Sequence, residues 1–361
     1  MTLDLKAHLR DLSELHAPSG HEEAAHEVLR AAWEPLTDEV RVSPLGNMTG
    51  IKRGEAQDNG TRRKIMLAAH MDEIGMMVTE VRDGFVLVQR ISGVDNRVMP
   101  AQAVIVHGRE RLPGVVAATP PHLLNAAERK KYPTWDNLII DVGLPPDEVA
   151  TLVRPGDLIT VDAALMELGG HLVAGKALDD RACVAAVTAC LDGLQGMQHT
   201  WDVYAVATVQ EEFGNFNGAR TAAYEIDPDV AIALDVTFGK QPGVTGDDSQ
   251  EMGGGPALSF GPNFHVRLYE AIQESAKSLE MDLQDDIITG RSGTDAWGIQ
   301  VARLGVPTAL LNVPLRNMHS PVETVDMRDV ARAGRLLAHF IAGLDADFMA
   351  SIDWKRATDE A

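Results

Sequence analysis

The chain has 361 residues, of which 45% are hydrophobic and 24% charged, a composition typical of a folded globular protein and not of a disordered or fibrous one. Its formal net charge of −21 argues against nucleic-acid binding, because contact with a phosphate backbone relies on clustered Lys and Arg. The length exceeds the size at which one hydrophobic core usually stops growing, so we expect one large or two unequal domains.

The first seventy residues predict two helices and two strands. Leucines recur at helical spacing over residues 5–15, and Ser19 followed by Glu22 predicts a capped start for a second helix. Strands are predicted at Glu39–Ser43 and Lys64–Ala69. The second is almost entirely apolar, as expected of a buried parallel strand whose carboxyl end carries function.

The pattern changes after Asp72 into short strands joined by turns. Met77–Val81 and Phe85–Arg90 flank an Asp-Gly pair, a strong signal for a hairpin. Further strands are expected at Ala103–His107, Val115–Ala118 and Asp157–Val161, with Gly-Arg-Glu-Arg-Leu-Pro-Gly as a turn region. We therefore predict a β-rich domain, residues 73–162, inserted into a larger domain formed by residues 1–72 and 163–361.

After the insert, helices and apolar strands alternate again, which predicts an α/β domain. Helices are expected at Asp180–Gly193, Phe264–Leu279, Asp295–Leu304 and Val330–Leu344. Strands are expected at Trp201–Thr208, Ile232–Leu234 and Thr308–Asn312.

The cysteines and the start of the chain indicate a cytoplasmic protein that is not bound to a membrane. Cys183 and Cys190 lie two turns apart on an expected helix, about 10 Å along its axis. This is too far for a disulfide, so we expect two small buried residues in a reducing compartment. The first residues lack the apolar stretch of a secretion signal, and no apolar run approaches the length of a membrane span.

Candidate functional residues stand at the ends of apolar strands and at a helix start. In Leu-Ala-Ala-His-Met-Asp, His70 and Asp72 share one face of an extended segment, so the imidazole could bind a metal while the carboxylate orients its other nitrogen. The alternative is a histidine hydrogen-bonded in a turn. In Gly-Lys-Ala-Leu-Asp-Asp-Arg, we expect one of Asp179 and Asp180 to cap the following helix and the other to be free for another task.

The strongest single feature is the pair Glu211 and Glu212, which follows an apolar strand. Adjacent carboxylates repel each other and lose solvation unless a cation or a proton compensates. One could bind a metal while its neighbour faces a substrate water; the alternative is a solvated pair in a loop. Asp235 and His319 also follow apolar strands, with a capped strand end or a surface turn as the alternative.

Together these motifs supply two histidines and several carboxylates near strand ends, where open α/β sheets form their sites. Nitrogen and oxygen ligands suit a pair of divalent ions, with zinc foremost and cobalt or manganese as alternatives.

The motifs and their order resemble the M42 metallo-aminopeptidases, which include glutamyl aminopeptidases and tetrahedral self-assembling peptidases. The resemblance spans almost the whole chain and rests on seven segments: Ala-Pro-Ser-Gly-His-Glu, Ala-His-Met-Asp-Glu-Ile-Gly, Gly-Lys-Ala-Leu-Asp-Asp-Arg, Gln-Glu-Glu-Phe-Gly, Ala-Leu-Asp-Val, Gly-Thr-Asp-Ala and Met-His-Ser-Pro-Val-Glu. It implies a doubly wound, mostly parallel α/β peptidase domain carrying the β-rich insert, which would serve in oligomerisation. It also implies peptide substrates and a homo-oligomer, in some members a tetrahedral dodecamer.

The same resemblance implies a two-metal centre. His70 and Asp235 would bind one ion. Glu212 and His319 would bind the other, and Asp179 would bridge the two.

For the remaining residues the resemblance implies supporting and catalytic roles. Glu211 would be the general base that takes a proton from a metal-activated water and passes it to the departing amine. Asp72 would orient His70, Asp180 would have a supporting role, and Asp295 would lie close to the site. Cys183 stands where related proteins often have Gly, so it is either an additional thiolate ligand or a core residue.

Three other functions stay open at this point. A glycoside hydrolase also uses paired carboxylates, but adjacent glutamates are badly placed for opposite faces of a sugar and the histidines would be unexplained. An N-acyl amidohydrolase would cleave blocked amides. A non-catalytic shell protein would be expected to lack the base, whereas this chain keeps Glu211.

Overall fold

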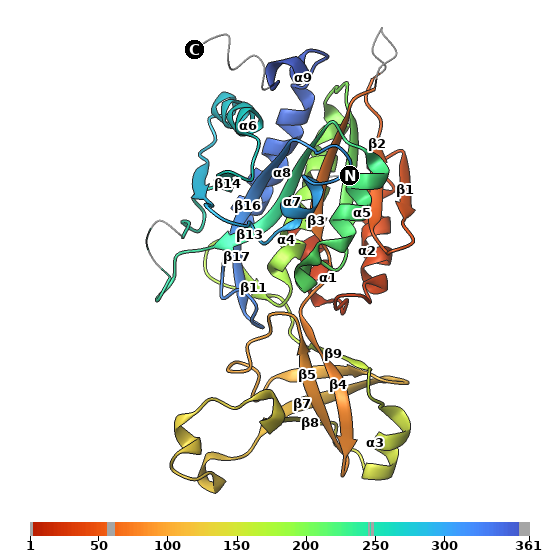
Figure 1. Cartoon of the computed structure of the whole chain (residues 1–361), viewed down its shortest axis with the longest axis vertical. Helices are drawn as coiled ribbons and strands as arrows, with labels where there is room; N and C mark the ends of the chain where they lie inside the picture. The colour runs from red at the N-terminus through yellow and green to blue at the C-terminus, as the bar shows by residue number, and fades with distance from the viewer. Residues whose placement is uncertain (1–2, 56–61, 245, 247–248, 354–361) are drawn as a thin grey trace.

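A computed structural model describes residues 3–55, 62–244, 246 and 249–353 of the chain. Figure 1 shows a large α/β part at one end of the long axis and a β-barrel at the other. None of the helices in the described ranges combines the length and apolar character needed to cross a bilayer.

The α/β part is built on one large mixed sheet. Its strands are β1 (Glu39–Val42), β2 (Met48–Lys52), β3 (Lys64–His70), β10 (Met166–Glu167), β11 (Leu172–Gly175), β12 (Asp202–Thr208), β13 (Val230–Phe238), β14 (Ala257–Phe260), β15 (Gln284–Ile287), β16 (Thr308–Arg316) and β17 (Glu323–Asp326). The main path runs β1-β2-β12-β3-β13-β16-β17-β11-β10, with β14 and β15 branching from β16. The central strands β12, β3, β13 and β16 are parallel.

Helices cover both faces of this sheet. They are α1 (Leu5–Glu14), α2 (Glu23–Trp33), α4 (Leu178–Gly193), α5 (Asn217–Ile226), α6 (Val266–Ser278), α7 (Asp295–Ile299), α8 (Met327–Ala342) and α9 (Phe348–Ser351). One apolar core contains residues of α1, α2, α4 and α8, and a second contains residues of α5 and α7. This arrangement confirms the predicted doubly wound, mostly parallel α/β fold.

The barrel closes in the order β4-β5-β8-β7-β6-β9, and all its strand pairs are antiparallel. Its strands are β4 (Gly75–Arg82), β5 (Phe85–Ile91), β6 (Ala103–His107), β7 (Arg111–Ala118), β8 (Leu138–Asp141) and β9 (Leu158–Val161), and α3 (Pro146–Leu152) packs beside them. Alternate strand residues fill a separate apolar core, so the barrel has an interior of its own.

Several predicted element boundaries are wrong. Strands β13 and β16 each extend four residues beyond their predicted ends at Leu234 and Asn312. Strand β7 begins at Arg111, inside the segment expected to be a turn, because Leu112 points into the barrel core and extends the alternating pattern. Helix α7 ends at Ile299, not Leu304, because Leu304 is fully exposed and a longer helix would bury nothing with it.

Two predicted helix caps are also wrong. Ser19 makes no capping bond to α2 and donates its hydroxyl to Asp72 instead. Neither Asp179 nor Asp180 closes the first turn of α4, because both carboxylates turn toward His70.

Candidate metal centre

Parallel strand register brings the predicted side chains to one edge of the sheet. His70 ends β3 and pairs in register with Thr208 at the end of β12, so Glu211 and Glu212 follow immediately beyond it. In β13, Ala233 pairs with Ala68, and Asp235 lies two residues further, level with His70. The carboxyl ends of three neighbouring strands therefore deliver these groups to the same place.

His70 lies between two carboxylates and is buried. Its Nδ1 is 3.2 Å from the carbonyl oxygen of Asp72 and 3.5 Å from Asp72 Oδ1, while its Nε2 is 3.2 Å from Asp179 Oδ1. Burial alone would lower the pKa of His70, but hydrogen bonds to Asp179 and Asp72 raise it well above its usual range.

Asp72 also holds the glutamate pair. Its carboxylate accepts the backbone N–H of Glu211 at 3.1 Å and that of Glu212 at 3.3 Å, together with the hydroxyl of Ser19 at 2.5 Å. One buried carboxylate thus fixes both the imidazole and the turn that carries the two glutamates.

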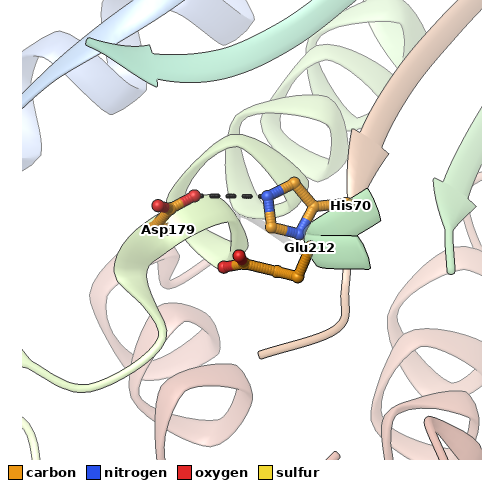
Figure 2. A group of neighbouring side chains, drawn as sticks. All are labelled: His70, Asp179 and Glu212. Atoms are coloured by element: carbon orange, nitrogen blue, oxygen red, sulfur yellow. Dashed lines mark hydrogen bonds and ion pairs between the residues drawn. The ribbon is translucent and has the colours of Figure 1, made fainter. Parts of the chain in front are cut away.

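Asp179 presents one carboxylate oxygen to each of two imidazoles. Oδ1 faces His70, and Oδ2 lies 3.3 Å from Nε2 of His319, which is also 3.6 Å from Oε2 of Glu212. Figure 2 shows His70, Asp179 and Glu212 directed toward one point, and one ligand atom of each lies within 4.8 Å of the others. Burial lowers the pKa of His319, but the hydrogen bond to Asp179 and the nearby negative charges of Glu212 and Glu323 together raise it to about 9.

A second group with the same spacing contains His70, Asp180 and Asp235. Asp180 accepts a hydrogen bond from the backbone N–H of His70 at 3.2 Å, so it is in direct contact with a proposed metal ligand. Cys183 is buried and donates its thiol to the carbonyl oxygen of Asp235 at 3.0 Å. Burial raises the pKa values of Asp180, Asp235 and the Cys183 thiol.

Glu211 and Asp295 lie beside these groups. Oε2 of Glu211 is 3.9 Å from Nε2 of His70, and burial raises the pKa of Glu211 well above its usual range. Asp295 accepts the hydroxyl of Thr208 through Oδ2, and burial raises its pKa to about 6. All nine predicted side chains are therefore gathered at this edge, while their individual roles stay predictions.

The donor set fits divalent cations. Oδ1 of Asp180, Oε1 of Glu211 and Oδ1 of Asp295 are buried without a hydrogen-bond partner. Within the described residues, no Lys or Arg forms an ion pair with the carboxylates of this cluster. Burying carboxylates without a partner costs free energy, so bound cations would stabilise this cluster. Mixed imidazole and carboxylate ligands suit zinc and similar divalent metal ions.

Two supporting residues were missed in the sequence. Glu323 is buried and accepts the backbone N–H groups of Asp179 at 3.1 Å and His319 at 2.8 Å, so it fixes two elements of the cluster at once. Its only signal was its place four residues after His319. Glu22 accepts the backbone N–H of Gln210 at 3.2 Å, and burial raises its pKa to about 7.

A cavity of about 840 Å³ opens onto the cluster. Glu211, Glu212 and His319 lie on its wall, with Phe238 and Trp297 among the apolar residues. The cavity is large enough for several amino-acid residues of a substrate.

Known proteins match this chain over most of its length. Residues 46–336 match the family described as M42 glutamyl aminopeptidase. A lysyl aminopeptidase of Pyrococcus furiosus is 40% identical over 301 residues, which cover 82% of this chain and 84% of that protein.

Solved structures share the whole architecture. A TET aminopeptidase from a marine sediment thaumarchaeon superposes with a TM-score of 0.90 at 31% identity, covering 97% of this chain and 99% of the other. The TET1 peptidase of Pyrococcus horikoshii, described as assembling into a tetrahedron or a large octahedral shell, gives a TM-score of 0.82 at 27% identity, covering 94% and 100%.

Proposed function

We propose that this chain, which belongs to the M42 glutamyl aminopeptidase family and is therefore a peptide hydrolase, removes N-terminal residues from peptides with two divalent metal ions. The observation that carries the two-metal proposal is the geometry of Asp179, whose two carboxylate oxygens face His70 and His319 separately.

The donor set can be divided between two ions. His70 and Asp235 would hold one, Glu212 and His319 the other, and Asp179 would reach both. When bound, such ions lower the pKa of a water molecule and offset negative charge that develops on the scissile carbonyl oxygen.

Glu211 would move the proton. Its unpaired Oε1 is the group that would accept a proton from the attacking water as the water oxygen bonds to the carbonyl carbon. As the C–N bond breaks, the same carboxyl would give the proton to the departing nitrogen.

Asp72 would keep the reacting groups aligned. Its contacts to the Nδ1 side of His70 and to the backbone of Glu211 fix the imidazole and the base relative to each other. A free, neutral α-amine is a nitrogen ligand that one of the two ions could accept, which would limit cleavage to the N-terminus.

The test is a panel of aminoacyl-p-nitroanilides and short peptides, free or N-acetylated, assayed after chelation and reconstitution. We expect activity on free N-termini only, lost with the chelator and restored by zinc, cobalt or manganese, with two ions bound per chain. Cleavage of acetylated peptides in preference to free ones would instead indicate an N-acyl amidohydrolase. Activity that survives complete metal removal would refute the mechanism.

Three finer proposals accompany this function. Zinc is the physiological metal, because the mixed imidazole and carboxylate ligands suit it.

The chain forms a homo-oligomer, supported by the assembly described for the similar Pyrococcus horikoshii peptidase, and we propose a tetrahedral dodecamer in which the barrel mediates contacts. The protein is cytoplasmic, supported by two buried, free cysteines. Light scattering that gives twelve times the mass of the chain would support the assembly, and a monomer would refute it.

A further inference from the structure

The barrel reaches the metal centre through the segment Ser92-Gly93, which follows β5 directly. Ser92 lines the same cavity as Glu211 and Glu212, although it belongs to the insert and lies 120 residues from Glu212 in sequence. The segment contacts two of the residues proposed as metal ligands, and each contact is specific in its geometry.

Ser92 holds Glu212 at two points. Its hydroxyl is 2.5 Å from the carbonyl oxygen of Glu212 and 2.9 Å from Oε2 of the same residue. A hydroxyl has one proton, which it can share between these acceptors, so both the backbone and the carboxylate of Glu212 are directed by one side chain. Oε2 is also the oxygen that faces His319.

Gly93 makes room for His319. A Cβ atom built on Gly93 would lie 2.3 Å from Nδ1 and 2.6 Å from Cε1 of the imidazole, distances at which the ring would have to move. The backbone of the barrel therefore packs directly against the Nδ1–Cε1 edge of His319, whose Nε2 faces Asp179 and Glu212.

Buried residues anchor this segment on both sides. Ile91 before it and Val94 and Met99 after it are buried, and Val94 and Met99 belong to the barrel core. Ser92 itself has a φ of +65°, a left-handed conformation that favours glycine and is uncommon for serine. Glycine would adopt this backbone conformation without strain, and the serine that stands there makes both contacts to Glu212 through its hydroxyl.

We propose that Ser92 and Gly93 are positioning residues through which the barrel sets the geometry of the Glu212–His319 half of the two-metal centre. The proposal rests on the proposed function, since it requires two ions. It assigns the insert a part in metal binding in addition to any part in assembly, and it predicts that the ion held by Glu212 and His319 is the one that depends on the barrel.

Two substitutions at Ser92 separate positioning from stability. Ser92→Ala removes the hydroxyl and keeps the strained φ, whereas Ser92→Gly removes the hydroxyl and relieves the strain, so the glycine variant should be at least as stable as the wild type. We expect both to weaken the second ion by about 10- to 100-fold, the usual effect of removing a hydrogen-bond partner of a metal ligand. The affinity of the first ion should stay unchanged.

Gly93→Ala provides an independent test with a matched control. It should displace the His319 ring and weaken the same ion, while Gly169→Ala, at a glycine with no heavy atom within 4 Å of the added Cβ, should bind both ions like the wild type. Binding is measured on the assembled apo-protein by zinc titration, with bound metal counted by mass spectrometry and unfolding followed in parallel.

The possible outcomes are distinct. Loss of affinity for one ion in the Ser92 and Gly93 variants, with the stability of Ser92→Gly retained, supports the inference. Wild-type affinity for both ions in Ser92→Gly overturns it and leaves the two-metal function standing. A wild-type chain that binds fewer than two ions, with His319→Ala binding as many, overturns the proposed function and this inference with it.

Discussion

The guanidinium of Arg181 lies 3.2 Å from the carboxylate of Glu73, and both side chains are buried. Each of the two residues directly follows a carboxylate of the cluster, Asp180 or Asp72, in the sequence. Glu73 also accepts a hydrogen bond from the ammonium of Lys176 at 2.8 Å, so one carboxylate balances two buried cations. The same guanidinium donates to the carbonyl oxygens of Leu12, Leu15, Ala17 and Met71. This network ties the segment that carries Asp72 to the first turn of α4, which carries Asp180, and to the end of α1.

Glu73→Gln should therefore destabilise the protein by about 3 kcal/mol or more, because it leaves two buried cations without their anion. Urea unfolding measures the loss. Glu80→Gln is the matched control, since the Glu80–Arg82 pair is exposed and should contribute nothing measurable. A Glu73→Gln variant as stable as the control would show that the ion cluster is already solvated.

Glu211→Gln should bind both metal ions and lose turnover by about 10²- to 10⁴-fold, because the amide keeps the shape of the side chain and cannot accept the proton. Steady-state kcat on an aminoacyl-p-nitroanilide and the metal content of the same sample measure the two effects. Glu225→Gln, at an exposed ion pair with Arg41, serves as the control. Full activity of Glu211→Gln would remove Glu211 from the mechanism.

Gly334→Ala should destabilise the fold by about 1–3 kcal/mol, because α8 approaches α4 there and an added Cβ would lie 2.7 Å from the carbonyl oxygen of Ala186. Gly196→Ala meets no heavy atom within 4 Å and should have no comparable effect. Thermal unfolding of the two variants beside the wild type is sufficient. Equal midpoints would mean that the helices separate without cost.

His8 should make stability depend on pH. Burial lowers the pKa of His8 from 6.5 to about 4. The hydroxyl of Thr188 donates to the carbonyl of Val184 and accepts from Trp33, so His8 Nε2, at 3.0 Å, is the donor of a neutral ring.

The unfolded chain therefore binds a proton at His8 more readily than the folded one. The contribution of His8 to the free energy of unfolding is fully present above pH 6.5. It is lost as the pH falls toward 4, by about 3 kcal/mol in total. Unfolding of the wild type and His8→Gln at several pH values isolates the difference, since other groups titrate in both. Parallel stability profiles would contradict the prediction.

The sequence alone determined the alternation of helices and apolar strands, the change of pattern after Asp72 and the order of the seven motifs, and these were enough to predict the fold class and the family. They sufficed because apolar periodicity and strand-end polar residues are local properties of the chain. The helix caps predicted at Ser19 and at Asp179 or Asp180 were wrong. The capping rule is local and pairs such side chains with the nearby helix backbone, whereas the tertiary structure pairs Ser19 with Asp72, and Asp179 and Asp180 with His70.

Only the tertiary structure decided which groups meet. Three contacts of the site join residues more than one hundred positions apart in the sequence: Asp179 with His319, Asp179 with Glu323, and Ser92 with Glu212. Such distances depend on strand register and on how the barrel packs against the sheet. No local pattern in the sequence encodes either, because both are set by the packing of whole elements and not by neighbouring residues.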